Sequence, residues 1–321
     1  MERRTALWLS HHWPEQYDRC AHIGHRHVCR RCAWFWPVCL GSMVLALAGV
    51  RWPITLDPWL IALLPVPVVL DHLGKLINPA LYDGFWFQGS DPLGRVLHAL
   101  SFTNELWFNS VRLFTNGPYW SLGYEFWYYM LFAAGWFLTG WKRILWVGGL
   151  MLLVGPKILM LFPIWMLGVW VYRINTTRQL SEATGWLLFV GSMVLYAGFR
   201  LAGLRDVLLQ ITFDLLGKRF VVNELMWSDE FMSAYVIGTL VACNFIGVHA
   251  LASRLAPLLS RGEPVIRNWA GYTFSIYLFH YPVLQFLAAV LPVRPEQAWS
   301  GVMLFVLTMA VCRVLGNYTE K

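Results

Sequence analysis

A short aromatic stretch carries the side chains whose types and spacing best suit chemistry. Residues Asn116–Phe132 read NGPYWSLGYEFWYYMLF, in which a turn precedes a proline suited to the first turn of a helix. On a helix running from there to Thr139, four polar side chains recur at three- and four-residue spacing and share one face: Ser121, Glu125, Tyr128 and Tyr129. This pattern predicts a carboxylate with hydroxyl groups one turn away on either side.

Glu125 is the key residue of this face because its helix is otherwise apolar. A carboxylate at membrane depth is costly, so it should face the bundle interior or a watery cavity. The simpler alternative is a buried glutamate that a neighbouring arginine holds to fix helix packing. We favour a functional acid or positioning group, which Ser121 and Tyr129 support and beside which Trp120 packs as a wall.

A second candidate is the Cys- and His-rich start of the chain, which holds four of the six cysteines. Cys29-x-x-Cys32, together with Cys20 and His25, predicts a tetrahedral zinc site. The alternative is a set of reduced thiols at the cytoplasmic mouth of a membrane helix. The remaining cysteines, Cys243 and Cys312, fall in apolar runs and are expected to pack.

The composition indicates which elements must position these residues. Of 321 residues, 58% are hydrophobic and only 13% are charged, with a mean hydropathy of +0.51. Soluble domains carry about a quarter charged residues. Nineteen Trp and thirteen Tyr suit interfacial aromatic belts. The formal charge of +7 falls in short loops, as the positive-inside rule describes, which argues against nucleic-acid binding.

Hydrophobic runs of about twenty residues predict the membrane spans. They are Ala33–Val50, Pro58–Ile77, Tyr119–Thr139, Gly185–Gly203, Met232–Leu251, Trp269–Leu291 and Trp299–Leu315. Ile144–Tyr172 is read as two short segments with a turn at Gly155-Pro156-Lys157. Gly94–Phe114 is read as an interfacial or re-entrant helix, and Arg205–Glu230 as a mixed amphipathic loop. No cleavable signal peptide is expected.

The fold class predicted is therefore all-α, a polytopic integral membrane helical bundle of about eight or nine transmembrane helices. Residues 1–55 form a Cys/His-rich segment with one membrane helix, and residues 56–321 form the main transmembrane domain. The loops with Lys142-Arg143, Arg173–Arg178 and Arg254–Arg267 are placed on the cytoplasmic side.

The Trp-Ser-Leu-x-x-Glu string resembles the signature of acyltransferase family 3, multi-span enzymes that acylate sugars of surface and secreted glycans. Further blocks follow in the family's order: NPALYDG (78–84), FTNELWF (102–108), GPKILML (155–161), PIWMLGVWVY (163–172) and NWAGYTFSIYLFHYP (268–282). The resemblance covers roughly residues 60–321.

This resemblance implies a bacterial inner-membrane enzyme that transfers an acyl group, expected to be acetyl, from acyl-CoA to a hydroxyl of a carbohydrate or lipid-linked glycan. Membrane lipid, the donor and the acceptor are then its partners. The implied catalytic residues are Glu125, Ser121 and His280. The implied substrate-binding residues are Trp120, Tyr128, Tyr129, Asn116 and Tyr277.

One family feature is missing from the chain. The family's first membrane helix carries an Arg, ten residues and then a His regarded as the catalytic base, and no His here has an Arg at that spacing. The base for the acceptor hydroxyl must then be another group. His280 shares a helix face with Tyr277, with a satisfied core histidine as the alternative. For His72 and His98 we favour the packing role.

Two alternatives to an active acyltransferase stay open. In the first, the chain is a catalytically inactive relative that binds a ligand or partner. In the second, it is a membrane module whose N-terminal Cys/His cluster binds zinc. The stretch GHRHVCRRCAWFWPVCLG also resembles an uncharacterised family of small bacterial membrane proteins with a Cys-x-Arg-Cys before a helix. A natural fusion and a start site placed inside a longer frame would both produce this arrangement.

Overall fold

The computed structural model describes residues 20–23, 26–29, 66–84, 87, 89–294 and 296–319. Within them helices dominate, as predicted. The one departure from an all-α fold is a hairpin of two short antiparallel strands, β1 (Cys20–Ile23) and β2 (Arg26–Cys29). The predicted span Ala33–Val50 and the start of the next, up to residue 65, lie outside the described residues.

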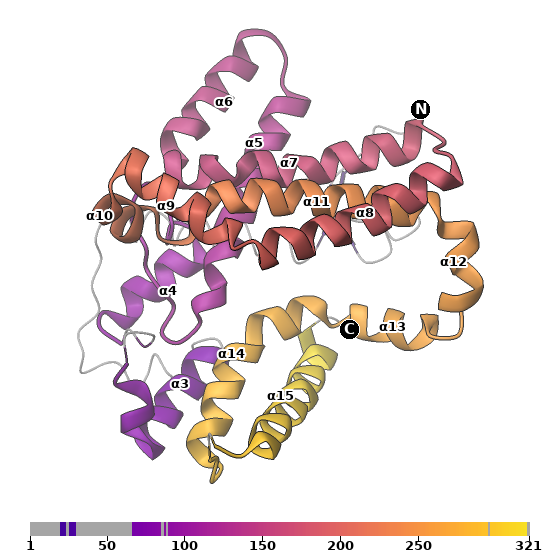
Figure 1. Cartoon of the computed structure of the whole chain (residues 1–321). Coiled ribbons are helices and arrows are strands. Elements are labelled where there is room, and N and C mark those ends of the chain that lie inside the picture. The colour runs from indigo at the N-terminus through magenta and orange to yellow at the C-terminus, as the bar shows by residue number, and fades with distance from the viewer. Residues whose placement is uncertain are drawn as a thin grey trace.

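The longer helices form three groups in space (Figure 1). One group is the layer of α7 (Pro156–Thr177), α8 (Glu182–Leu201) and α11 (Phe231–Ala250), in which α11 contacts both other helices. The hairpin of α5 (Trp120–Phe137) and α6 (Gly140–Val154) joins this layer through contacts with α7. The third group is α3 (Val66–Ile77), α14 (Thr273–Val290) and α15 (Ala298–Thr319), with α14 in the middle.

Shorter elements connect these groups. They are η3 (Pro79–Tyr82), α4 (Pro92–Leu100), η4 (Gly117–Tyr119), α9 (Leu204–Leu216), α10 (Lys218–Phe220), the π-helical η5 (Val221–Leu225), η6 (Met226–Ser228), α12 (Ala252–Leu259) and α13 (Glu263–Ala270). The segment Arg205–Glu230 is thus mostly helical, which corrects the predicted mixed loop. Its apolar positions recur at helical spacing, and α9 packs them against α8 and α11.

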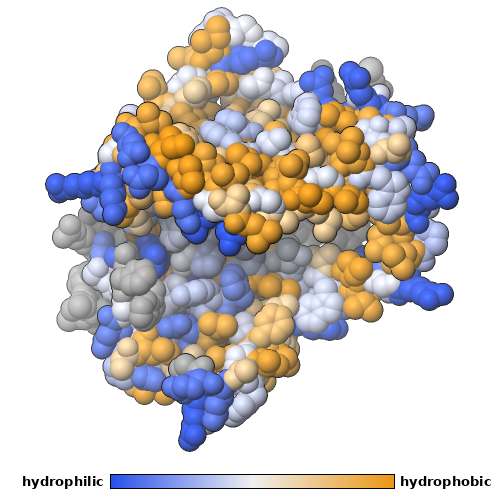
Figure 2. Space-filling view, in the orientation of Figure 1, coloured by the Kyte–Doolittle hydropathy of each residue, from blue (hydrophilic) through white to orange (hydrophobic). Residues whose placement is uncertain are grey.

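Five described helices are long and apolar enough to cross a membrane: Pro156–Thr177, Glu182–Leu201, Lys218–Ala250, Thr273–Val290 and Ala298–Tyr318. In the space-filling view, hydrophobic side chains gather over α8 and α11, while hydrophilic side chains lie toward both ends of these helices (Figure 2). That distribution suits lipid around the middle of the layer and water at its two edges.

The predicted turn at Gly155 is confirmed. Gly155 has φ of 79° and separates α6 from α7, and Pro156 occupies the first position of α7. A Cβ at this glycine would lie 2.7 Å from the Cα of Trp107, so both conformation and space require glycine. The helix that follows has 22 residues, however, and continues through Pro163, so it is not the short segment expected.

The interfacial helix expected over Gly94–Phe114 ends early, at Leu100. Beyond it the chain follows an irregular path through the protein interior, and its polar side chains at Ser101, Thr103, Asn104 and Glu105 are all buried. Irregular backbone inside a membrane protein is tolerated where it is buried in protein or lines a water-filled cavity. This segment, residues 101–116, is buried at both ends and reaches the surface at Trp107 and Asn109, and it is called the central loop below.

Candidate functional site

The central loop is held by side chains from three helices. The Thr115 backbone N–H and hydroxyl both donate to Asp71 of α3, at 3.1 and 2.5 Å. The indole of Trp127 on α5 donates to the carbonyl of Phe102 at 2.8 Å. Lys157 of α7 donates to the backbone carbonyl of Asn109 in the loop. These bonds satisfy backbone and hydroxyl groups that would otherwise be costly to bury.

Glu105 and Lys157 form a fully buried ion pair at the start of α7. The Lys157 Nζ lies 2.6 Å from the Glu105 carboxylate. The Glu105 side chain is 2% exposed and the Lys157 side chain 0%. Lys157 also donates to the carbonyl of Asn109, and Ser110 donates to Glu105 at 3.2 Å. Sequence analysis did not single this pair out, although each charge stands alone in an apolar block.

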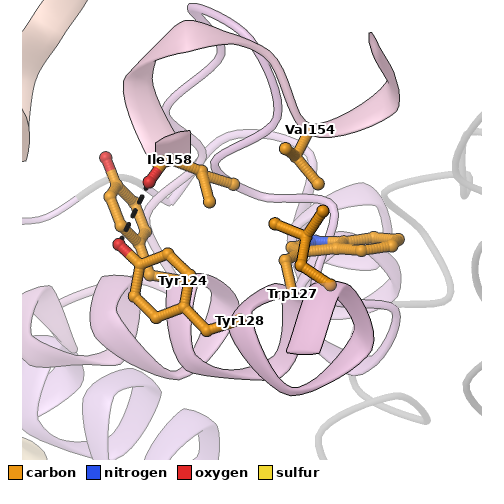
Figure 3. Close-up of a cluster of buried hydrophobic side chains, with 6 residues drawn as sticks. Tyr124, Trp127, Tyr128, Val154 and Ile158 are labelled. Carbon is orange, nitrogen blue, oxygen red and sulfur yellow. Dashed lines mark hydrogen bonds between the residues drawn. The ribbon is translucent and has the colours of Figure 1, made fainter. Parts of the chain in front are cut away.

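A cluster of buried hydrophobic side chains packs α5 against α6 and α7 (Figure 3). Tyr124, Trp127 and Tyr128 of α5 pack with Val154 and Ile158, and the Tyr128 hydroxyl donates to the Ile158 carbonyl at 3.1 Å. Tyr128 therefore serves helix packing here and does not share the surroundings of Glu125, in contrast to its predicted place among substrate-binding residues.

Glu125 itself lies on the other side of α5 and is exposed. It lines a cavity of about 430 Å³ between α4, α5 and α14, and its neighbours there include Leu122, Tyr129 and Phe274. Tyr129 donates to the Glu125 carboxylate at 3.1 Å. No ion pair of Glu125 occurs among the described residues, so the alternative of a glutamate held by arginine has no support in this part of the chain.

Ser121 lies one turn before Glu125 and meets the second predicted helix, α14. Its hydroxyl is 2.6 Å from the hydroxyl of Tyr277, which also donates to the carbonyl of Pro118. Because Tyr277 uses its proton on that carbonyl, Ser121 donates to Tyr277. The two hydroxyl groups thus join α5 to α14 within one turn of Glu125.

His280 follows Tyr277 on α14 and has a defined tautomer. Its Nδ1 lies 2.9 and 2.8 Å from the carbonyl oxygens of Ile276 and Tyr277, and a carbonyl can only accept. Nδ1 therefore carries the proton of the neutral ring, which leaves the lone pair on Nε2. The ring can act as a base through Nε2.

The other histidines of the sequence analysis are more constrained. His72 bonds to the Val68 carbonyl and packs edge-on against Phe114, as a packing residue would. The Nδ1 of His98 lies 2.8 Å from the hydroxyl of Thr103 in the central loop, and burial lowers the pKa of its imidazole below the usual value. Both occupy supporting positions around the central loop.

Two further predicted binding residues lie at the edges of this region. Trp120 stacks on Trp227 with ring centroids 5.3 Å apart, which suits the predicted wall. Asn116 is buried and donates to the Leu278 carbonyl at 3.1 Å, while its Oδ1 has no hydrogen-bond partner among the described residues. Asn116 therefore ties the turn before α5 to α14.

The zinc prediction falls largely outside the described residues, which exclude His25 and Cys32. The register of β1 and β2 pairs the backbone of Cys20 with that of Cys29, two of the four predicted ligand positions. Elsewhere in the described chain, no group of three or more His, Cys, Asp or Glu residues comes together.

Comparison with known proteins adds no relative from which function could be transferred. No family model matches the chain, and neither a curated protein nor a solved structure matches it. What the fold defines is a helical protein with at least five helices suited to a membrane, and the site must be interpreted from its own geometry.

Proposed function

We propose that the protein is a membrane O-acyltransferase that moves an acyl group from acyl-CoA to a hydroxyl of a carbohydrate or cell-surface glycan precursor. The observation that carries the proposal is the exposed Glu125 carboxylate, which lines a ligand-sized cavity with the Ser121–Tyr277 hydroxyl pair one turn away. Cavities of about 300–1,000 Å³ are typical of small-molecule sites.

The chemistry assigns each group a role. The acceptor hydroxyl attacks the thioester carbonyl as its proton passes to the Glu125 carboxylate, and a C–O bond forms. The C–S bond then breaks, and the departing CoA sulfur takes up the proton that Glu125 received, which restores the carboxylate. Tyr129, which already donates to Glu125, holds the carboxylate toward the cavity. The Ser121 and Tyr277 hydroxyls, whose protons are used on Tyr277 and on the Pro118 carbonyl, hold α14 against α5 one turn from Glu125.

His280 is the second candidate for the base, because its Nε2 carries the free lone pair and its ring lies 6.2 Å from that of Tyr277. An acyltransferase that uses His280 would lose activity on His280→Asn and keep it on Glu125→Gln. These two variants therefore separate the two assignments within the same reaction.

The test is acylation of surface glycan in cells that depend on this protein for that modification. We expect Glu125→Gln to lower acylation by roughly 10²–10⁴-fold, the usual contribution of a general base. The matched control is Glu182→Gln, the same change at an exposed glutamate paired with Arg254. Equal acylation by wild type and Glu125→Gln would remove Glu125 from the mechanism.

The inactive-relative reading predicts a different result. Cells carrying the wild-type protein and cells lacking it would then show the same glycan acylation. The specific observation in its favour is the missing Arg-x10-His pattern of the resembled family.

A further inference from the structure

The cavity beside Glu125 is far more apolar than transfer of an acetyl group requires. Its described lining includes the side chains of Val96, Ala99, Leu100, Phe102, Leu113, Leu122, Phe126, Phe274 and Leu278. Glu125 is the one charged side chain among the described lining residues, and the hydroxyl of Tyr119 is already bonded to the Ala99 carbonyl at 2.9 Å. A polar sugar would leave its hydroxyl groups without partners along these walls.

The cavity also has room for a chain. Its volume is about 430 Å³. Since a water molecule occupies about 30 Å³ in the liquid, such a space takes roughly a dozen groups of that size. The two carbons of an acetyl group would leave most of the apolar wall without contact, whereas a medium-length hydrocarbon chain would cover it.

On the inner side of the cavity, the lining side chains are buried and packed against one another. Val96, Ala99 and Leu113 are buried, and they pack in one cluster with Val68 and Phe114. Phe102 stacks on Phe126 with ring centroids 4.6 Å apart. On the outer side, Phe274 is 55% exposed and belongs to α14, one of the helices suited to crossing a membrane.

We propose that this cavity binds the hydrocarbon chain of the acyl donor, so that the thioester substrate is a medium-chain or longer acyl-CoA. The inference rests on the proposed function and names its donor. The acyl chain begins at the reacting carbonyl carbon, and the apolar walls begin at Glu125 and Tyr129, where that carbonyl must lie. The proposed acceptor is a carbohydrate, whose hydroxyl groups these walls cannot bind.

The experiment measures binding of decanoyl-CoA and acetyl-CoA to the full-length protein in lipid nanodiscs, and it requires no turnover. We expect decanoyl-CoA to bind more tightly, by up to roughly fourfold per buried methylene group. Leu122→Trp places an indole in the cavity and should weaken decanoyl-CoA binding by roughly tenfold, as expected for excluding about two methylene groups, with acetyl-CoA binding unchanged.

The matched control is Val147→Trp, in a separate apolar cavity between α5, α6 and α7 whose described lining has no charged side chain. It should leave the binding of both ligands unchanged. Phe274→Ala is the second cavity variant. Its side chain is largely exposed, so folding tolerates the change, while the bound chain loses contact and decanoyl-CoA binding weakens.

Three outcomes would overturn the inference. They are equal affinity for the two thioesters, an equal loss of both ligands in Leu122→Trp, and an equal effect of Val147→Trp on decanoyl-CoA. Selective decanoyl-CoA binding without transfer to any acceptor would keep the chain site and reject the acyltransferase. Glycan acetylation without selective decanoyl-CoA binding would keep the acyltransferase and reject the chain site.

Discussion

Two carboxylates in neighbouring parts of the chain have opposite surroundings, and we infer their roles from this difference. Glu105 is buried against Lys157 and accepts from Ser110, so its charge is matched within the protein. Glu125 is exposed to a cavity and accepts from Tyr129 alone among the described contacts. A carboxylate whose charge is already compensated holds structure, whereas one that faces an open cavity is available to a substrate.

The buried pair yields a stability prediction. Lys157→Met leaves the Glu105 charge buried without its partner, so we expect the free energy of unfolding to fall by about 3–5 kcal/mol. A double variant that combines Glu105→Leu with Lys157→Met removes both charges and should recover most of that loss. Thermal unfolding of the purified variants measures the difference.

The control for this pair is Arg254→Met, which breaks an exposed ion pair with Glu182. Exposed pairs contribute about 0–1 kcal/mol, so its unfolding temperature should stay close to that of the wild type. If Lys157→Met is no more harmful than Arg254→Met, the buried pair does not hold the central loop.

At the scale of elements, small residues allow α8 and α11 to approach closely. A Cβ at Gly247 of α11 would lie 2.6 Å from the backbone nitrogen of Phe189 and 2.8 Å from the Gly185 carbonyl oxygen. Asn244 adds a hydrogen bond across the same contact, to Ser192 at 3.1 Å. Small residues at the crossing and a polar bond beside it are typical of helix pairs in membranes.

This contact predicts that Gly247→Leu separates the two helices. We expect a loss of about 1–3 kcal/mol in the free energy of unfolding, the range that overpacking costs. Gly191→Leu, on α8, is the matched control because a Cβ there has no neighbour within 4 Å. An equal unfolding temperature for the two variants would mean that the close approach of α8 and α11 does not matter for stability.

The sequence predicted most helices because their apolar runs are long, and it predicted the turn at Gly155 because Gly-Pro has a strong local preference. It predicted less well where long-range contacts decide the structure. The central loop loses its helix after Leu100 because Asp71, Trp127 and Lys157, all distant in sequence, bind its polar groups. The local sequence preference of residues 101–116 could not predict hydrogen bonds to residues so far away in the chain.

The placement of the candidate site residues, too, agrees with the sequence prediction where local spacing decides it and agrees less well where long-range packing does. Helical spacing placed Ser121, Glu125 and Tyr129 together, and the bonds between Tyr129 and Glu125 and between Ser121 and Tyr277 agree with that placement. Spacing did not separate Tyr128 from Tyr129, because adjacent residues differ by only about 100° around a helix. Packing against α7 decides which of the two is buried.

At the scale of the whole molecule, the described chain places the candidate site residues between α5 and α14, a pair that joins two of its three helix groups. The Ser121–Tyr277, Tyr277–Pro118 and Asn116–Leu278 hydrogen bonds connect them. The proposed reaction therefore depends on the two groups keeping their relative position, with Glu125 open to the cavity between them.

The most direct test of this account is release of CoA thiol by the purified protein in lipid vesicles, with acyl-CoA as donor and a carbohydrate acceptor in solution. We predict acceptor-dependent thiol release by the wild type and by Glu182→Gln, and a loss of roughly 10²-fold or more in Glu125→Gln. Acceptor-dependent release that is equal in Glu125→Gln and the wild type would contradict the account.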